Sequence, residues 1–153
     1  MQVGPGLNPI AWLQTGAGDA AVHDGVLGVW DTQGQDGLFA VRLQVVRQDQ
    51  TIETATIQVT VDNTPPIVQP IFPQPGDRIS ASGGQVLFQV DASDNVAVQK
   101  VEYRLDGRLL GTADQSPFSL AWQPTTGEHT LVISVYDLAG SHTESEPVKF
   151  SVY

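Results

Sequence analysis

The chain of 153 residues contains no cysteine, and this absence excludes several classes of site. Disulfide bridges, thiolate metal centres and cysteine nucleophiles all need a thiol. Basic residues are scarce as well, since 7 Lys and Arg stand against 17 Asp and Glu and the formal net charge is −10. A protein that binds the phosphate backbone of nucleic acid needs clustered Lys and Arg, so nucleic acid is excluded as a partner.

Long hydrophobic runs are also missing. No stretch approaches the roughly 18–20 apolar residues that a membrane-spanning helix needs, so no membrane span is expected. The 41% of hydrophobic residues are instead spread over short alternating segments, among 15 Gly and 10 Pro. Frequent Val and Thr between turn residues are typical of an all-β protein, and the apolar fraction is sufficient for a folded core.

Two adjacent prolines divide the chain. An alternating run that ends at Val61 is followed within a few residues by Pro65-Pro66. Because proline fixes φ and lacks a backbone N–H, a central strand cannot continue through this segment. We therefore expect a stiff linker between a first unit, residues 1–64, and a second unit, residues 65–153. Each unit has a formal charge of −5, so the acidity belongs to both.

Alternation of apolar and polar residues runs through the second unit, which predicts strands with one face toward a core. Asp106-Gly107 predicts a type I′ hairpin, because this turn needs positive φ at both central residues. Prolines between Ile67 and Ile79 confine any strand there to a sheet edge. Together these features predict a two-sheet sandwich. The residues expected in its core are Val86, Phe88, Val90, Val101, Tyr103, Leu120, Trp122, Leu131, Ile133, Val135 and Phe150.

The two units repeat one another. Trp30 and the alternating strand that follows Gly37 correspond to Trp122 and the strand that follows Gly127. The first copy is about two strands short, so either the chain is a piece of a longer protein, which we favour, or the copy is a reduced sheet. Its strands are expected near Ile10–Leu13, Val26–Trp30, Leu38–Val46 and Ile52–Val61.

The apolar face of this short unit lacks an opposing sheet, and leaving it in water is unfavourable. It includes Val41, Leu43, Val45, Ile57 and Val59. We expect residues 1–9, the second unit or another molecule to cover this face. Open strand edges make dimerisation through the first unit one of the expected outcomes.

Several segments of the second unit resemble bacterial immunoglobulin-like domains. They are Ser93-Asp94-Asn95-Val96, Val101-Glu102-Tyr103, Pro117-Phe118, Gly127-Glu128-His129-Thr130-Leu131 and Tyr136-Asp137-Leu138-Ala139-Gly140. The resemblance covers most of residues 66–153. It implies that the chain is a tandem of immunoglobulin-like β-sandwich modules, the first of them short or truncated.

Segments of the first unit resemble the C-terminal region of some bifunctional bacterial penicillin-binding proteins, which are peptidoglycan glycosyltransferases and transpeptidases. These segments are Gly4-Pro5-Gly6-Leu7-Asn8-Pro9, Trp12-Leu13-Gln14-Thr15-Gly16, Gly25-Val26-Leu27-Gly28-Val29-Trp30-Asp31-Thr32 and Asp36-Gly37-Leu38-Phe39. The resemblance implies an extracytoplasmic location beside the cell wall. It transfers no catalytic residue, because the Ser-x-x-Lys and Lys-Thr-Gly motifs of the transpeptidase are absent.

The sequence offers no convincing catalytic group of its own. A Gly-x-Ser-x-Gly elbow and a His-Glu-x-x-His helix are both absent. In the repeat, His129 corresponds to Phe39, which has no proton to transfer, so packing explains the position better than catalysis. The glycine pairs in Gly4-Pro5-Gly6 and Gly16-Ala17-Gly18 precede no helix and no Lys, and are interpreted as turns.

The leading hypothesis is a non-catalytic, extracytoplasmic accessory region that acts as a spacer or docking arm for a cell-wall enzyme and meets a glycan or protein partner. A carbohydrate-binding module is the first alternative. Trp12, the least constrained of the three tryptophans, would then stack on a sugar, whereas ordinary packing is its simpler interpretation. A surface adhesin repeat is a further alternative.

One cofactor is considered, a calcium ion at the junction of the two units. The linker and the loops after two strands carry carboxylate and amide oxygens, the ligands that calcium takes. Asp and Asn also favour turns, where each caps its own loop, and this simpler explanation stays open. The residues concerned are Asp62, Asn63, Asp91, Asp94, Asn95 and Asp137.

Overall fold

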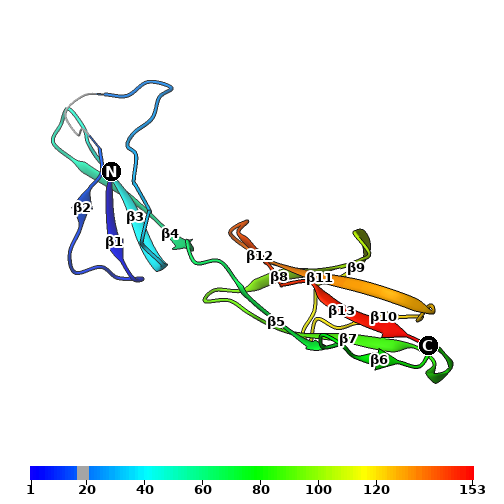
Figure 1. Cartoon of the computed structure of the whole chain (residues 1–153). Coiled ribbons are helices and arrows are strands. Elements are labelled where there is room, and N and C mark those ends of the chain that lie inside the picture. Colours follow the sequence, from blue (N-terminus) through cyan, green and yellow to red (C-terminus); the bar gives the residue numbers. More distant parts are fainter. Residues whose placement is uncertain (17–20) are drawn as a thin grey trace. The chain divides into compact units, whose positions relative to one another are not determined.

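The protein is described by a computed structural model that covers residues 1–16 and 21–153. It forms two compact units, Met1–Asn63 and Thr64–Tyr153. Strands dominate both units (Figure 1), and the helical structure of the described residues is a short 3-10 segment at Ala81–Gly83. The predicted all-β fold class is therefore confirmed. Among the described residues, no helix is long and apolar enough to cross a membrane.

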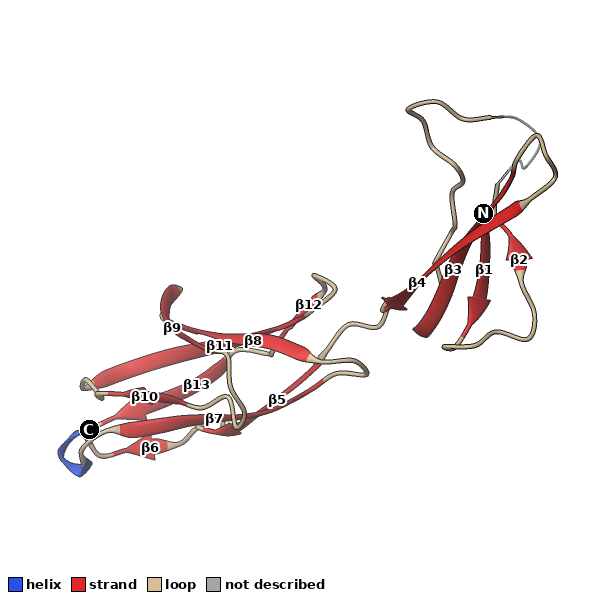
Figure 2. Cartoon of the chain, turned by 180° about the vertical axis from the view of Figure 1, so that it is seen from behind, coloured by secondary structure: helices blue, strands red, loops and turns tan. Residues whose placement is uncertain are grey.

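The second unit consists of two facing sheets (Figure 2). Its strands are β5 (Ile67–Phe72), β6 (Arg78–Ile79), β7 (Val86–Ser93), β8 (Val98–Leu105), β9 (Arg108–Ala113), β10 (Leu120–Trp122), β11 (Gly127–Asp137), β12 (His142–Glu144) and β13 (Val148–Val152). One sheet has the order β10-β7-β5, and the other has the order β6-β13-β11-β8-β9 with β12 beside β11. All pairs are antiparallel except β6 with β13.

The inner faces of these sheets form the core. Every residue expected there is buried except Val86 and Leu120, which are half-buried and pack against the core. Leu120 opens β10, an edge strand, and Val86 opens β7, so neither is covered on all sides. At the centre, the Phe88 ring lies 5.2 Å from Trp122 and 6.2 Å from Tyr103, centroid to centroid.

Local turn chemistry sets the edges of the sandwich. Asp106 and Gly107 have φ of 51° and 78° and join β8 to β9, as the type I′ prediction requires. The proline-rich segment forms β5 and then β6, which lie at edges of the two different sheets. The register of β5 against β7 is irregular between Pro70 and Phe72, where proline offers no backbone N–H.

The first unit is a single antiparallel sheet in the order β2-β1-β3-β4. Its strands are β1 (Gln2–Pro5), β2 (Leu13–Gln14), β3 (Gly37–Val46) and β4 (Ile52–Val61). Two expectations were wrong. Gly4 and Pro5, interpreted as part of a turn, belong to β1, which pairs with β3, and Val26–Trp30 is not a strand. The predicted turn at Gly16-Ala17-Gly18 extends beyond the described residues.

The sheets of the two units differ in a way that explains why Val26–Trp30 is not a strand. The order β2-β1-β3-β4 parallels β9-β8-β11-β13 of the complete unit, and Trp30 contacts Phe39 at 4.9 Å as Trp122 contacts His129 at 5.2 Å. In the complete unit, the segment with Trp122 is a strand because it pairs with β7. The described part of the first unit has no counterpart of β7, so the Trp30 segment has no edge to join.

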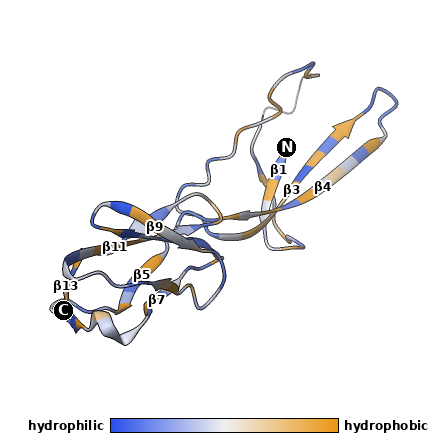
Figure 3. Ribbon diagram, turned by 90° about the vertical axis from the view of Figure 1, so that its right-hand side faces the viewer, coloured by the Kyte–Doolittle hydropathy of each residue, from blue (hydrophilic) through white to orange (hydrophobic). Residues whose placement is uncertain are grey.

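The exposed apolar face of the first unit follows from the same difference. Leu131 and Ile133 of β11 are fully buried, whereas Val45 on β3 and Ile57 on β4 are 46% and 62% exposed. Figure 3 shows that hydrophobic and hydrophilic residues both occur along β3 and β4. Residues 2–5, which were among the candidates to cover this face, instead extend the sheet sideways as β1.

Candidate functional site

Two aspartates cap loops at one end of the second unit. Asp94 follows β7, and its Oδ1 accepts hydrogen bonds from the backbone N–H groups of Val96 and Ala97 at 2.9 and 2.8 Å. Asp137 ends β11, and its Oδ1 accepts two backbone N–H groups of the following turn at 2.7 and 2.8 Å. The local capping that the turn chemistry predicts is thus present at both positions, through one oxygen of each carboxylate.

The strand pairing brings these two carboxylates together. The register of β11 against β8 shifts between Tyr136 and Asp137, and such a bulge redirects a side chain. One carboxylate oxygen of Asp94 lies within 4.8 Å of one of Asp137. Both Oδ2 atoms are shielded from solvent and accept no hydrogen bond, and the Asp137 side chain is fully buried. Two negative charges at this separation repel by about 3–4 kcal/mol at an effective dielectric constant of 20.

The other residues predicted as calcium ligands lie outside this pair. Asp91 is exposed on β7, and Asn95 is exposed in the loop after it. Asn63 caps its own unit, where its Nδ2 donates to the carbonyl oxygen of Gln35 at 2.7 Å. Asp62 directly follows β4 in the first unit, and its role as a ligand stays a prediction from the sequence.

Trp12, the predicted sugar-stacking residue, lies in the first unit beside Arg42. The guanidinium carbon is 3.9 Å from the ring centroid, and Gln2 holds the Arg42 side chain through a hydrogen bond of 2.6 Å from Nε. Both residues line an open depression of about 690 Å³ together with Asn8 and Gln58. A half-buried indole next to amide and guanidinium groups can stack on a sugar ring and bind its hydroxyls.

The chain passes close to itself beneath this depression. A Cβ atom on Gly4 would lie 2.4 Å from Cβ of Pro9 and 2.7 Å from the carbonyl oxygen of Ala11. Only glycine allows this approach, which brings the segment with Trp12 onto the sheet. The Gly4-Pro5-Gly6 motif therefore has a packing role.

His129 is buried in the second unit and packs beside Trp122 and Phe150, as its correspondence to Phe39 predicts. The sequence did not predict its polar contacts, in which Nδ1 lies 2.8 Å from Oδ2 of Asp106 and Nε2 lies 2.8 Å from the carbonyl oxygen of Thr125. Two acceptors require both ring nitrogens to donate, as in the protonated ring.

The pKa values follow from these contacts. Burial is the largest influence on His129 and lowers its pKa, but the hydrogen bonds to Asp106 and Thr125, with the charge of Asp106, outweigh burial and raise the pKa above its usual 6.5. Burial likewise raises the pKa of Asp106, and the bonds from His129 and Thr130 outweigh it and lower that pKa. The pair is a structural clamp between β11 and the β8–β9 hairpin.

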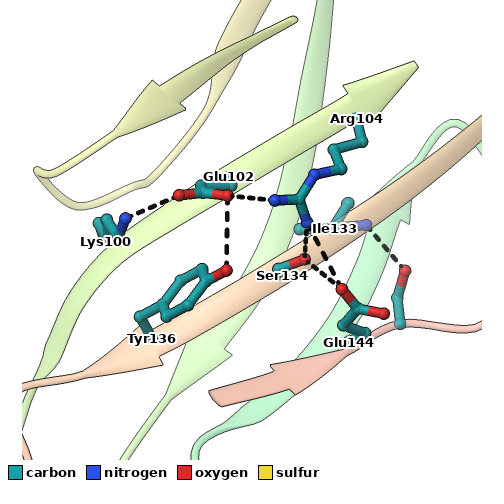
Figure 4. Close-up of polar contacts among 8 residues, drawn as sticks. Lys100, Glu102, Arg104, Ile133, Ser134, Tyr136 and Glu144 are labelled. Atoms are coloured by element: carbon teal, nitrogen blue, oxygen red, sulfur yellow. Dashed lines mark hydrogen bonds and ion pairs between the residues drawn. The ribbon is translucent and has the colours of Figure 1, made fainter. Parts of the chain in front are cut away.

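A polar network on the outer face of the larger sheet was missed (Figure 4). Glu102 accepts hydrogen bonds from Lys100 at 2.7 Å and from Arg104 at 2.9 Å. The amine of Lys100 is its main stabilising partner and lowers the pKa of Glu102 against a smaller effect of burial. Alternate positions on one strand share a face, so the spacing of these residues could have predicted the network.

One segment of the second unit matches a third motif of the transpeptidase type. Ser93-Asp94-Asn95 has the form Ser-x-Asn. Its middle residue caps the loop after β7, and the chain has no Ser-x-x-Lys to supply a nucleophile. The match is therefore explained by turn chemistry.

Comparisons with known proteins agree with this geometry. Residues 66–133 match a family model described as a bacterial Ig domain. The solved structures of the fibronectin(III)-like modules of Clostridium thermocellum CbhA are 21% identical, with a TM-score of 0.52, over 56% of this chain and 94% of that chain. This likeness shows the fold alone.

A second structure, dimeric latent PorU from Porphyromonas gingivalis, is 17% identical over 83% of this chain and 13% of that chain, with a TM-score of 0.40. No curated protein matches the chain. The two facing sheets and the match to a bacterial Ig domain support an immunoglobulin-like β-sandwich fold for the second unit.

Proposed function

We propose that the chain is a non-catalytic, extracytoplasmic accessory region that serves as a spacer or docking arm at the C-terminus of a cell-wall enzyme of the penicillin-binding class. The observation that carries this proposal is the tandem of two separate β units, the second an immunoglobulin-like domain, joined at the Pro65-Pro66 linker. Immunoglobulin-like domains are generally non-catalytic, and bacterial ones are often found outside the cell or on its surface.

The packing of the second unit supports this role. Its two sheets close on each other around side chains such as Phe88 and Tyr103, which are fully buried. A filled core resists deformation, which suits a part that holds other parts at a distance. Two consecutive prolines give the linker an extended, stiff backbone, and this stiffness also suits a spacer.

The test uses the natural parent protein. An antibody against the second unit captures it from envelope extracts of the organism that encodes it, and the captured protein is exposed to fluorescent penicillin. A labelled band much larger than 16.4 kDa, whose labelling excess unlabelled penicillin prevents, is the expected result. Capture of a protein that penicillin does not label would reject the link to a transpeptidase.

A second candidate function is glycan binding by the first unit, and the depression at Trp12 favours it. The exposed part of the indole offers an apolar surface for the C–H face of a sugar. Arg42, Asn8 and Gln58 offer donors and acceptors around it. A passive spacer does not need such a grouping.

Sedimentation with purified peptidoglycan separates the two functions. A spacer stays in the supernatant, whereas a glycan-binding module sediments with the polymer. Trp12→Ala would abolish specific sedimentation, and Trp12→Phe, which keeps an aromatic face, would preserve most of it. Sedimentation that is equal for all three proteins would reject a role of Trp12 in sugar binding.

A further inference from the structure

We propose that Asp94 and Asp137 bind a calcium ion at the end of the second unit. The proposal uses only residues of that unit, so it stands independently of the accessory role and of the linker. It rests on two neighbouring carboxylates, each of which has a shielded oxygen without a hydrogen-bond donor.

The hydrogen bonding of the pair is incomplete in one specific way. Each carboxylate uses Oδ1 to accept two backbone N–H groups of its own loop, which fixes the orientation of the side chain. Each Oδ2 is left without a donor among the described residues, although Asp137 is fully buried. Buried polar atoms almost always have a partner, and a buried carboxylate needs one most.

The missing partner is a positive charge. One oxygen of the Asp94 carboxylate lies within 4.8 Å of one oxygen of the Asp137 carboxylate, close enough for one small cation to contact both side chains. No described side chain donates a hydrogen bond to either Oδ2, and the nearby cations of β8, Lys100 and Arg104, both pair with Glu102 on the outer face of the sheet. A free cation is therefore the ligand that satisfies both oxygens at once.

The chemistry of the donors favours calcium. Carboxylate oxygens are hard ligands, and the pair belongs to no described group with a histidine or cysteine that would attract zinc. Calcium accepts six to eight oxygens in irregular geometry and tolerates ligands that loops supply. Magnesium demands a near-octahedral arrangement and gives up its water reluctantly. Water and neighbouring oxygens complete the calcium sphere beyond the two carboxylates.

An ion at this position would join the loop after β7 to the turn after β11. Ala97 and Leu138 already share a backbone hydrogen bond of 3.3 Å between these segments. Replacing repulsion between two carboxylates by attraction to a shared cation would make this end of the sandwich rigid.

The test is differential scanning calorimetry of the whole chain in a chelator, in calcium chloride and in magnesium chloride, at constant ionic strength. Asp94→Asn and Asp137→Asn keep an Oδ1 that can cap the loop but remove the charge. Asp114→Asn is the matched control, because Asp114 is an exposed aspartate of the same unit.

We expect excess calcium to raise the melting temperature of the second unit by about 10 °C in the parent chain and in Asp114→Asn. Magnesium should give a much smaller rise. In chelator, Asp94→Asn and Asp137→Asn should melt at or above the parent, because they relieve repulsion, and calcium should give them no further rise. The two variants should thus melt at or above the parent chain in chelator but below it in calcium. A residue that only caps a loop is not expected to give this reversal.

Three results would overturn the proposal. The first is an identical melting temperature of the parent chain in calcium and in chelator. The second is a calcium effect that persists in both charge-removing variants. The third is an equal rise with magnesium, which would reject the assignment of calcium.

Discussion

At the scale of single residues, Trp122 carries the largest predicted effect on stability. Its side chain is 7% exposed and contacts the rings of Phe88, Phe150 and His129. Removing such a side chain leaves a cavity, so Trp122→Ala should lower the free energy of unfolding of the second unit by about 3–5 kcal/mol.

Calorimetry of the whole chain measures this loss in the transition of the second unit. The control is Leu87→Ala, which removes a side chain that is 45% exposed on β7 and should cost less than about 1 kcal/mol. A loss below 1 kcal/mol for Trp122→Ala would contradict the burial of the indole.

His129 should make stability depend on pH. Its pKa is raised in the folded protein, so the contribution of the charged ring is fully present below about pH 6.5 and disappears as the pH rises through the raised value. The free energy of unfolding should therefore fall as the pH rises above about 6.5.

His129→Phe introduces the residue of the corresponding position, Phe39, and should remove this slope. His23 and His142 remain in the variant, so the difference between the two proteins reports on His129 alone. Denaturant unfolding at several pH values is the measurement. Equal slopes for both proteins would show that the clamp does not titrate in this range.

At the scale of elements, the hairpin between β8 and β9 depends on Gly107. Its φ is 78°, where a side chain is strained, although the space around it is open. Gly107→Ala should therefore destabilise the second unit by about 1–2 kcal/mol. Gly83→Ala, at a position that is also open but has no positive φ, should be close to neutral in the same unfolding experiment.

The strands that the sequence predicted well are those with a complete set of partners. The β8–β9 hairpin and the edge position of β5 follow from turn chemistry and from proline, and both are local properties. Val26–Trp30 has apolar residues suited to a strand, but pairing is a property of the neighbouring chain, and the described residues offer no edge for it. β1 was missed because Gly and Pro at its end are typical of turns.

The candidate sites also combine local features, which the sequence can predict, with contacts between distant segments, which it cannot. The loop positions of Asp94 and Asp137 could be predicted because Asp is favoured where strands end. Their proximity depends on the pairing of β11 with β8 and on the shift at Tyr136, which no local pattern specifies. The contact between His129 and Asp106 spans 23 positions in sequence and was missed for this reason.

At the scale of the whole molecule, the exposed apolar face of the first unit should drive association. Val45 and Ile57 leave a large part of their side chains in water, and covering such a face is favourable at about 25 cal/mol per Å². We expect the chain to self-associate as its concentration rises, through the first unit.

Ile57→Lys places a charge on this face and should weaken the association at least tenfold in analytical ultracentrifugation. Thr56→Lys is the matched control, because adjacent residues of a strand point to opposite faces. A chain that stays monomeric at all accessible concentrations, or two variants that associate equally, would show that this face is not the contact.

In the described residues, the chain consists of two β units with corresponding strand orders, of which the first is a single sheet and the second a closed sandwich. Hydrogen exchange of the whole chain at low concentration tests it most directly, because protection reports the opening free energy of each strand. The backbone N–H groups of β11 should exchange at least about 100-fold more slowly than those of the corresponding strand β3. Equal protection of β3 and β11 would contradict the account, because it would show that the first unit is covered as completely as the second.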